Sequence, residues 1–295
     1  MAQVPSAIDF GPLWNFDDPV STEVRFRELL VTVRASGDVG GTVEVMTQVA
    51  RSQGLQQKFD DAHTTLDEAQ GLVRADLGRA RLRLLLERGR VSRSSGQPDE
   101  ARPLFEEAWR LGREIGEENL AIDAAHMVAL VVPPAEATRW SEEGMRAAES
   151  ATDPKAKRWL GPFYNNLGWT YHDQGDFARA LELFEKSVAF RQSQGSQPEI
   201  WIARWSVARA YRSLGRHEEA LEAQEALRSE REAAGHPDGY VFEELGECLL
   251  ALGRAEEAKS HFAHAHELLS TDPWMQRDEP ARLARMAELG GVSAR

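Results

Sequence analysis

A pattern of small and aromatic residues recurs along this chain of 295 residues at intervals of 38 to 40 residues. The clearest copy spans residues 164–191, YNNLGWTYHDQGDFARALELFEKSVAFR. Its first part predicts a helix whose inner face carries residues at helical spacing: Tyr164, Leu167, Gly168 and Tyr171. Gly175-Asp176 ends that helix, and a second helix follows with an inner face of its own: Ala180, Phe184 and Ser187. Small residues stand where two helices must approach closely, so the segment predicts a packed helix pair.

Five further segments align with this copy. With Tyr164 as the anchor, the equivalent positions are Met46, Leu85, Ala124, Tyr164, Arg204 and Phe242. The copy around Ala124 is the weakest, because Val131-Val132-Pro133-Pro134 replaces the glycine turn. A period kept this closely indicates internal repetition, in which each helix pair buries its apolar face against the next. We predict one all-α solenoid over residues 21–290, with repeats starting near residues 43, 82, 121, 161, 201 and 239 and a flexible point at Pro133-Pro134.

The order aromatic, Leu-Gly, aromatic, Ala and Phe in residues 164–184 resembles the tetratricopeptide repeat. The period is nearer 40 residues than the usual 34, and in this it resembles the lengthened repeats of kinesin light chains and of bacterial peptide-sensing regulators. The resemblance implies a right-handed α-solenoid of about six helix pairs. It also implies a mode of action, namely holding other molecules in a groove, without indicating which molecule is held.

The two ends of the chain lie outside the repeats. We expect residues 1–20 to be irregular, because three prolines and a glycine interrupt the apolar residues there. This segment either packs across the first helices as a cap or, because IDFGPLWNFDD is acidic and aromatic, fills the groove itself. A leading helix is expected from Ser21, as N-cap, to near Gly37. A closing helix is expected from Asp278 to Leu289, followed by a tail over residues 291–295.

Composition excludes several classes of protein. The net charge of -13 argues against wholesale binding of nucleic acid or of an anionic membrane surface. Cys248 is the single cysteine, so the chain has no intrachain disulfide framework. The first residues show no basic region followed by an apolar run, and no stretch of 18 apolar residues occurs. We therefore expect a soluble, cytoplasmic protein without a membrane span. The scarcity of lysine, five among 35 basic residues, favours a bacterial source.

Catalytic and cofactor motifs are absent from the sequence. It contains no GxSxG, HExxH, P-loop or paired CxxC motif, so we expect a protein that is not an enzyme and needs no cofactor. His261 and His264 share a helix face and, with Glu257 or Glu267, offer zinc ligands. Surface histidines without a convergent third or fourth ligand are the more common case, so we predict no metal site.

The position of charges within the repeat predicts a binding groove. In such solenoids the first helix of each pair lines the concave groove, while the second helices here carry acidic runs such as Asp60-Asp61, Glu106-Glu107 and Glu218-Glu219. Counting one, five and eight residues from each anchor places these residues in the groove: Arg51, Arg90, Arg93, Asn165, Trp169, His172, Trp205, Arg209 and Arg212. Guanidinium groups bind carboxylates bidentately, and tryptophans add apolar contact area.

We therefore predict an adaptor or regulator that binds an acidic, partly aromatic peptide of a partner protein. Anion contacts would come from Arg90, Arg93, Arg209 and Arg212. Three alternatives stay open at this point. Acids of neighbouring helices pair with the arginines, the N-terminal segment fills the groove of its own chain or of a second copy, or the arginines bind a nucleic acid or nucleotide.

Overall fold

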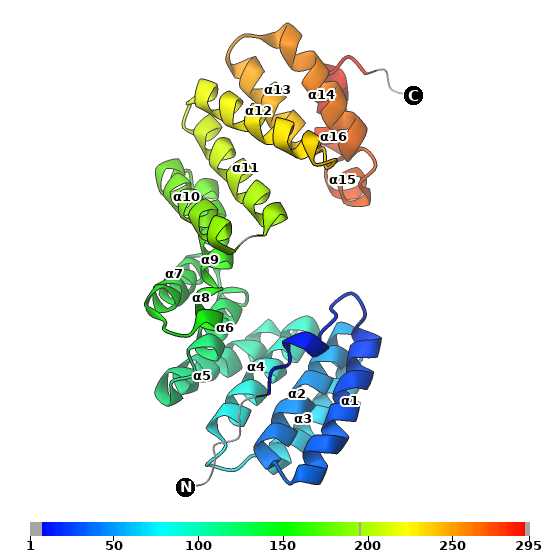
Figure 1. Cartoon of the computed structure of the whole chain (residues 1–295), viewed down its shortest axis with the longest axis vertical. Coiled ribbons are helices and arrows are strands. Elements are labelled where there is room, and N and C mark those ends of the chain that lie inside the picture. The colour runs from blue at the N-terminus through cyan, green and yellow to red at the C-terminus, as the bar shows by residue number, and fades with distance from the viewer. Residues whose placement is uncertain (1–7, 195, 293–295) are drawn as a thin grey trace. The chain divides into compact units, whose positions relative to one another are not determined.

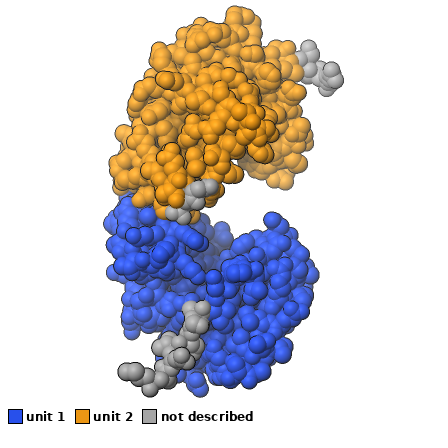
Figure 2. All heavy atoms as spheres, viewed as in Figure 1, with its two compact units in different colours: residues 1–160 blue, residues 161–295 orange. Residues whose placement is uncertain are grey.

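The computed structural model describes residues 8–194 and 196–292. The part of the predicted irregular segment over residues 1–7 and the tail over residues 293–295 lie outside these ranges. Within them every regular element is a helix, which confirms the predicted all-α solenoid of helix pairs (Figure 1). The chain divides into two compact units, Met1–Leu160 and Gly161–Arg295, shown in blue and orange in Figure 2.

The first unit begins with a short 3₁₀ helix, followed by α-helices of about one to five turns. Their bounds are η1 Gly11–Leu13, α1 Pro19–Ser36, α2 Val39–Leu55, α3 Phe59–Leu72, α4 Gly78–Ser94, α5 Pro98–Ile115, α6 Glu118–Ala129, α7 Pro134–Ser150 and α8 Pro154–Lys157. The sequence suggested Ser21 as the N-cap of the leading helix, and this prediction is wrong. Asp18 caps it instead, because Pro19 sits at the first helical position and the Asp18 carboxylate accepts the Ser21 backbone N–H.

The second unit contains the remaining helices, which also stack in consecutive pairs. Their bounds are α9 Leu160–Asp173, α10 Phe177–Gln194, α11 Gln197–Ser213, α12 His217–Ala233, α13 Gly239–Ala251, α14 Ala255–Leu269, α15 Pro273–Asp278 and α16 Pro280–Leu289. The closing helix therefore begins at Pro280 and not at Asp278. The residue before that proline, Glu279, leaves the helical conformation, so a separate short helix, α15, precedes it.

In three of the described helix pairs, a phenylalanine of the second helix packs on a glycine of the first. Phe105 and Phe184 are fully buried, and each packs directly on a glycine of the preceding helix, Gly89 and Gly168 respectively. A Cβ atom at Gly89 would lie only 2.5 Å from Cε1 of Phe105, so no larger residue fits there without movement of the ring. Gly175 has a φ of 81° and ends α9, because this left-handed conformation is open to glycine at little cost. The repeat pattern thus records helix–helix contacts.

Candidate functional site

In the first unit, the N-terminal segment crosses the face formed by the first helices of the pairs. We call residues 8–18 the strap and the face formed by α2, α4 and α6 the first-helix face of this unit (Figure 1). The Trp14 indole N–H donates to Oε1 of Gln48 over 3.0 Å. The guanidinium of Arg51 lies 5.3 Å from the ring centroid of Trp14 and 5.6 Å from that of Phe16. The Arg83 guanidinium lies 4.9 Å from the Phe10 ring. These cation–π contacts fix the strap on α2 and α4.

The strap is also part of a small core cluster with α1. Phe10 is only 5% exposed, and both its ring and the ring of Trp14 pack edge-on against Phe26. The Arg25 guanidinium donates to the Leu13 carbonyl over 3.0 Å. The strap therefore packs against the leading helix and also lies on the first-helix face. The sequence left two roles open for this segment, a cap across the first helices or a segment that fills the groove, and these two roles are compatible.

A cavity of about 510 Å³ lies between the strap and helices α2, α4, α6 and α8. We call it the strap cavity. Its charged lining consists of Asp9, Arg51, Arg79, Arg83, Glu117, Asp123, Asp153, Lys155 and Arg158. Gln48 and Asn119 add amide groups, while Ile8, Phe10, Trp14 and Leu120 contribute apolar surface.

Carboxylates of neighbouring first helices hold most arginines of this face. Arg90 donates to Asp123 over 2.6 Å and to Glu87 over 2.8 Å. Arg83 donates to Glu44 over 2.7 Å. Burial lowers the pKa of Arg90, but the facing carboxylates outweigh burial and raise that pKa overall. The expected separation of charges, with arginines on first helices and acids on second helices, is therefore wrong here. Arg90 is buried between two acids and does not project freely.

In the second unit, the first helices carry a row of aromatic side chains. Trp169 on α9, Trp205 on α11 and Tyr240 on α13 follow one another with ring centroids 5.8 and 6.4 Å apart. The Trp205 indole N–H donates to the Tyr240 carbonyl over 3.3 Å. His172 lies 5.1 Å from the Trp169 ring, and its Nε2 is 2.9 Å from Oγ of Ser213. We call Trp169, Trp205 and Tyr240 the aromatic row.

The arginines beside the aromatic row share one buried acid. Arg212 binds both carboxylate oxygens of Glu244, over 2.7 and 2.9 Å, and Nε of Arg209 lies 3.2 Å from the same group. Glu244 is 4% exposed and belongs to α13, a first helix, so the expected charge separation fails in this unit as well. Burial and the positive charge of Arg209 lower the pKa of His172, which favours its neutral form.

The nine predicted groove residues thus divide between the units. Arg51 and Arg90 meet at Glu87, and Arg93 is exposed and makes no ion pair within the described part of the first unit. Trp169, His172, Trp205, Arg209 and Arg212 form one cluster in the second unit, while the Asn165 amide donates to Asn166. Four further residues take part in the contacts of these faces and were not predicted from the sequence: Gln48, Arg83, Glu244 and Tyr240.

The repeat contains a signal for two of the ion pairs, Arg51 with Glu87 and Arg209 with Glu244. The position two residues after the anchor is acidic in only two copies, at Glu87 and Glu244. Each follows a copy with arginine five residues after the anchor, Arg51 or Arg209, and each of those arginines pairs with the acid of the next copy. Comparing positions across adjacent copies therefore predicts these contacts.

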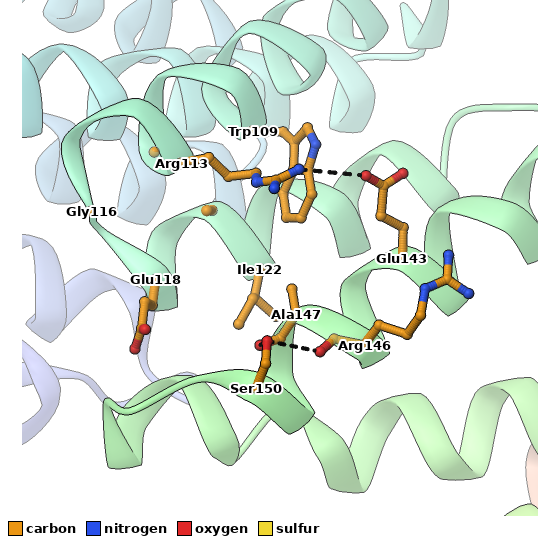
Figure 3. Close-up of a pocket in the computed structure, with 11 residues that line it drawn as sticks. Trp109, Arg113, Gly116, Glu118, Ile122, Glu143, Arg146, Ala147 and Ser150 are labelled. Atoms are coloured by element: carbon orange, nitrogen blue, oxygen red, sulfur yellow. Dashed lines mark hydrogen bonds and ion pairs between the residues drawn. The ribbon is translucent and has the colours of Figure 1, made fainter.

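Another cleft, of about 540 Å³, lies between α5, α6 and α7 (Figure 3). Trp109, Ile122 and Ala147 line it with apolar surface. The Arg113 guanidinium lies 5.1 Å from the Trp109 ring and pairs with Glu143 over 3.7 Å, as Figure 3 shows. The other two charged groups of the lining have partners outside the cleft, because Arg146 pairs with Glu142 over 3.9 Å and Glu118 accepts the backbone N–H groups of Thr152 and Asp153.

Two further features bear on chemistry. Cys248 is fully buried, and burial raises the pKa of its thiol to about 12, so it stays protonated near neutral pH. In the described ranges, no cluster of three or more His, Cys, Asp or Glu side chains is placed to hold a metal ion. None of the helices in the same ranges is both long and apolar enough to span a membrane.

Comparisons with known proteins connect the fold to a repeat family. Residues 163–193 and residues 203–227 each match the tetratricopeptide repeat. These segments comprise most of α9 with α10, and parts of α11 and α12. No curated protein matches the sequence.

Solved structures of repeat proteins are similar in fold. RapI in its apo form is 13% identical, with a TM-score of 0.75 over 94% of this chain and 77% of that one. BtubC (BKLC) from P. vanneervenii is 19% identical, with a TM-score of 0.61 over 76% of this chain and 95% of that one. The TPR-like repeats of a putative kinesin light chain from Podosopora anserina are 21% identical, with a TM-score of 0.53 over 65% and 95% of the two chains. At these identities the likeness is one of fold.

Proposed function

We propose that this chain holds an acidic, aromatic segment of a partner protein against its first helices. The chain is a tetratricopeptide-repeat protein. Solenoids of this class present extended binding surfaces to other proteins. The observation that carries this proposal is the seating of the strap. The strap has this chemistry itself, with the sequence IDFGPLWNFDD, and it lies on the first-helix face of the first unit. That face therefore accommodates an irregular segment of this chemistry.

In the second unit, the aromatic row is the proposed docking site. A pocket of about 270 Å³ opens beside it, lined by Trp201, Ile202, Trp205 and Tyr240. Ile202 is 56% exposed, so apolar surface is available to a partner. A large apolar side chain of the partner would fill the pocket and bury this surface, at about 25 cal/mol for each Å².

Anion contacts in this site would come from the arginines beside the row. Each guanidinium has five N–H donors, and Arg212 uses two of its three nitrogens on Glu244. A carboxylate of the partner would bind the remaining donors of Arg212 and Arg209, while Asn165 and His172 flank the row. In the first unit, the exposed Arg93 is the corresponding contact.

The seating of the strap also favours a second function, self-occlusion of the first unit. A partner that docks on α2 and α4 must displace Phe10 and Trp14. Burial of side chains of this size contributes roughly 1.5–3 kcal/mol each, so displacement would weaken binding by at least about tenfold. Exchange of straps between two copies would instead produce a homo-oligomer.

Binding of nucleic acid through the same arginines finds less support. Arg83, Arg90 and Arg212 are already paired with acids that belong to the same faces. Few of these charges are left to neutralise phosphates, and the carboxylates beside them would repel a polyanion.

A synthetic peptide of residues 8–18 with a fluorescent label tests the proposal directly. Fluorescence anisotropy would be measured with the wild-type full-length chain and with Trp205→Ala. We expect saturable binding to the wild type and at least tenfold weaker binding to Trp205→Ala, because the pocket loses its largest wall. Arg139→Gln, at an exposed position of α7, is the matched control.

Two further arms separate the parts of the proposal. A peptide with asparagine in place of its three aspartates should bind more weakly if the arginines contribute. Trp14→Ala should release the strap and expose a second peptide site on the first unit. Equal binding to the wild type and Trp205→Ala would contradict the proposed docking site, and a single site in Trp14→Ala would contradict self-occlusion.

A further inference from the structure

The strap cavity has the size of a small-molecule site. Its volume of about 510 Å³ falls in the range of roughly 300–1,000 Å³ that is typical of such sites. Four helices and the strap form its walls, so a ligand inside would contact elements that are far apart in the sequence. Its lining combines apolar rings of the strap with a larger number of charged groups, most of them from the helices, so a charged ligand suits it better than a purely apolar one.

Three of the five cations in its lining are paired with acids that Arg51 and Arg158 do not contact. Arg79 binds Glu44 and Glu117, and Arg83 binds the same Glu44 over 2.7 Å. Lys155 pairs with Asp9 of the strap over 3.4 Å. These pairs hold the helices and the strap together, and their charges are largely cancelled within the wall.

Arg51 is poorly matched. Among the residues that the structure describes, its one ion pair is with Glu87 at the long distance of 3.5 Å, and Arg90 holds the same carboxylate oxygen over 2.8 Å. The rings of Trp14 and Phe16 cover the Arg51 guanidinium. Burial lowers the pKa of Arg51, and the Glu87 carboxylate only partly opposes this. An additional anion close to Arg51 would therefore be stabilising.

Arg158 and Asn119 supply the other free donors. Arg158 lines the cavity, is exposed, and forms no ion pair in the described ranges. The side-chain carbonyl of Asn119 accepts the Trp159 indole N–H over 3.0 Å, which fixes the orientation of the amide. Its NH₂ group is left as a donor.

We infer that the strap cavity binds a small organic carboxylate, held by Arg51 and Arg158 with a hydrogen bond from Asn119. Guanidinium groups match the planar geometry of a carboxylate. A phosphate concentrates up to two negative charges on one group, whereas each carboxylate group carries one, so Asp9, Glu117, Asp123 and Asp153 in the same lining would repel a phosphate group more strongly. A ligand that touches both the strap and the helices binds the closed strap best, so its binding holds the strap in place. This site is separate from the aromatic row and does not rest on partner binding there.

Titration of the full-length chain with succinate, at constant ionic strength set by sodium chloride, tests this inference. We expect saturable binding by calorimetry and slower proteolytic cleavage within the strap as succinate is added. Arg158→Gln should weaken binding by about tenfold or more, because it removes a charge-assisted hydrogen bond. Because Arg158 is exposed, its replacement should leave the fold intact, which circular dichroism checks. Arg74→Gln, an exposed arginine of the loop between α3 and α4, should leave binding unchanged.

The outcomes that overturn the inference are distinct. Equal binding of succinate to the wild type and Arg158→Gln would place the ligand elsewhere. No saturable binding of succinate, acetate or citrate would remove the carboxylate site altogether. Tighter binding of inorganic phosphate than of succinate would overturn the assignment to a carboxylate. Binding without slower cleavage of the strap would overturn the coupling between ligand and strap.

Discussion

The two units present their first helices in different states. In the first unit, Trp14 and its neighbours cover the face, whereas in the second unit Trp169, Trp205 and Tyr240 form a row beside an open pocket. The ion pairs beneath these aromatic side chains follow one pattern, because the same contact between an arginine of one copy and an acid of the next occurs in both units. In both units the paired arginines link adjacent helices. The aromatic side chains distinguish the covered face of the first unit from the open face of the second.

The largest effects should come from the contacts that the two units share. Replacing Phe105 or Phe184 by alanine removes a fully buried ring that packs on a glycine. We expect each change to destabilise its unit by about 3–5 kcal/mol, because the cavity left behind cannot collapse fully. Urea unfolding followed by circular dichroism measures this. A loss below about 1 kcal/mol in only one unit would show that the two units are not packed by the same rule.

A smaller effect, with a sharper contrast, concerns the shared acid of the second unit. Glu244→Ala leaves Arg209 and Arg212 without their partner in a partly buried place. We expect a loss of about 3 kcal/mol in the free energy of unfolding. The control is Glu219→Ala, which breaks the exposed pair with Arg216 and should change stability far less, because solvent screens that pair. Similar losses for both variants would refute the view that the first-helix pairs link the repeats.

The smallest effect is a dependence on pH. Burial and nearby arginines lower the pKa of His172 in the second unit, and burial lowers that of His126 in the first. Below the usual histidine pKa of about 6.5, the unfolded chain therefore binds more protons than the folded chain. Stability is fully present above that pH and is lost as the pH falls through the window between 6.5 and the lowered pKa values.

Urea midpoints at pH 7.5 and pH 5.5 check this dependence in each unit. His172→Gln and His126→Gln should each reduce the difference between the two midpoints. A difference that is unchanged in both variants would assign the acid sensitivity to other groups.

Much of the fold follows from the sequence, because the repeat pattern records local contacts. The anchor residues, the Gly168–Phe184 contact and the turn at Gly175 all depend on residues close together in one helix pair. Helix ends were harder to predict. Asp18 and Ser21 are both good N-caps, and only the position of Pro19 decides between them.

The candidate site was harder to predict, for a physical reason. The repeat position of a residue predicts the helix face on which it lies. It does not predict which side chain of the next repeat that residue contacts. Glu244 lies 32 residues from Arg212, so their pairing depends on how one repeat is set against the next. Trp14 lies 34 residues from Gln48 and belongs to no repeat, so periodicity contains no information about its position.

The sharing of Glu244 by two arginines has a consequence for the rate at which a partner arrives. Two guanidinium groups beside one carboxylate leave one positive charge at the aromatic row, in a chain whose net charge is -13. Its field extends over about one Debye length, roughly 8 Å at physiological ionic strength. An acidic segment would be attracted within that distance before any ring is buried. Added salt should therefore slow association more than it speeds dissociation.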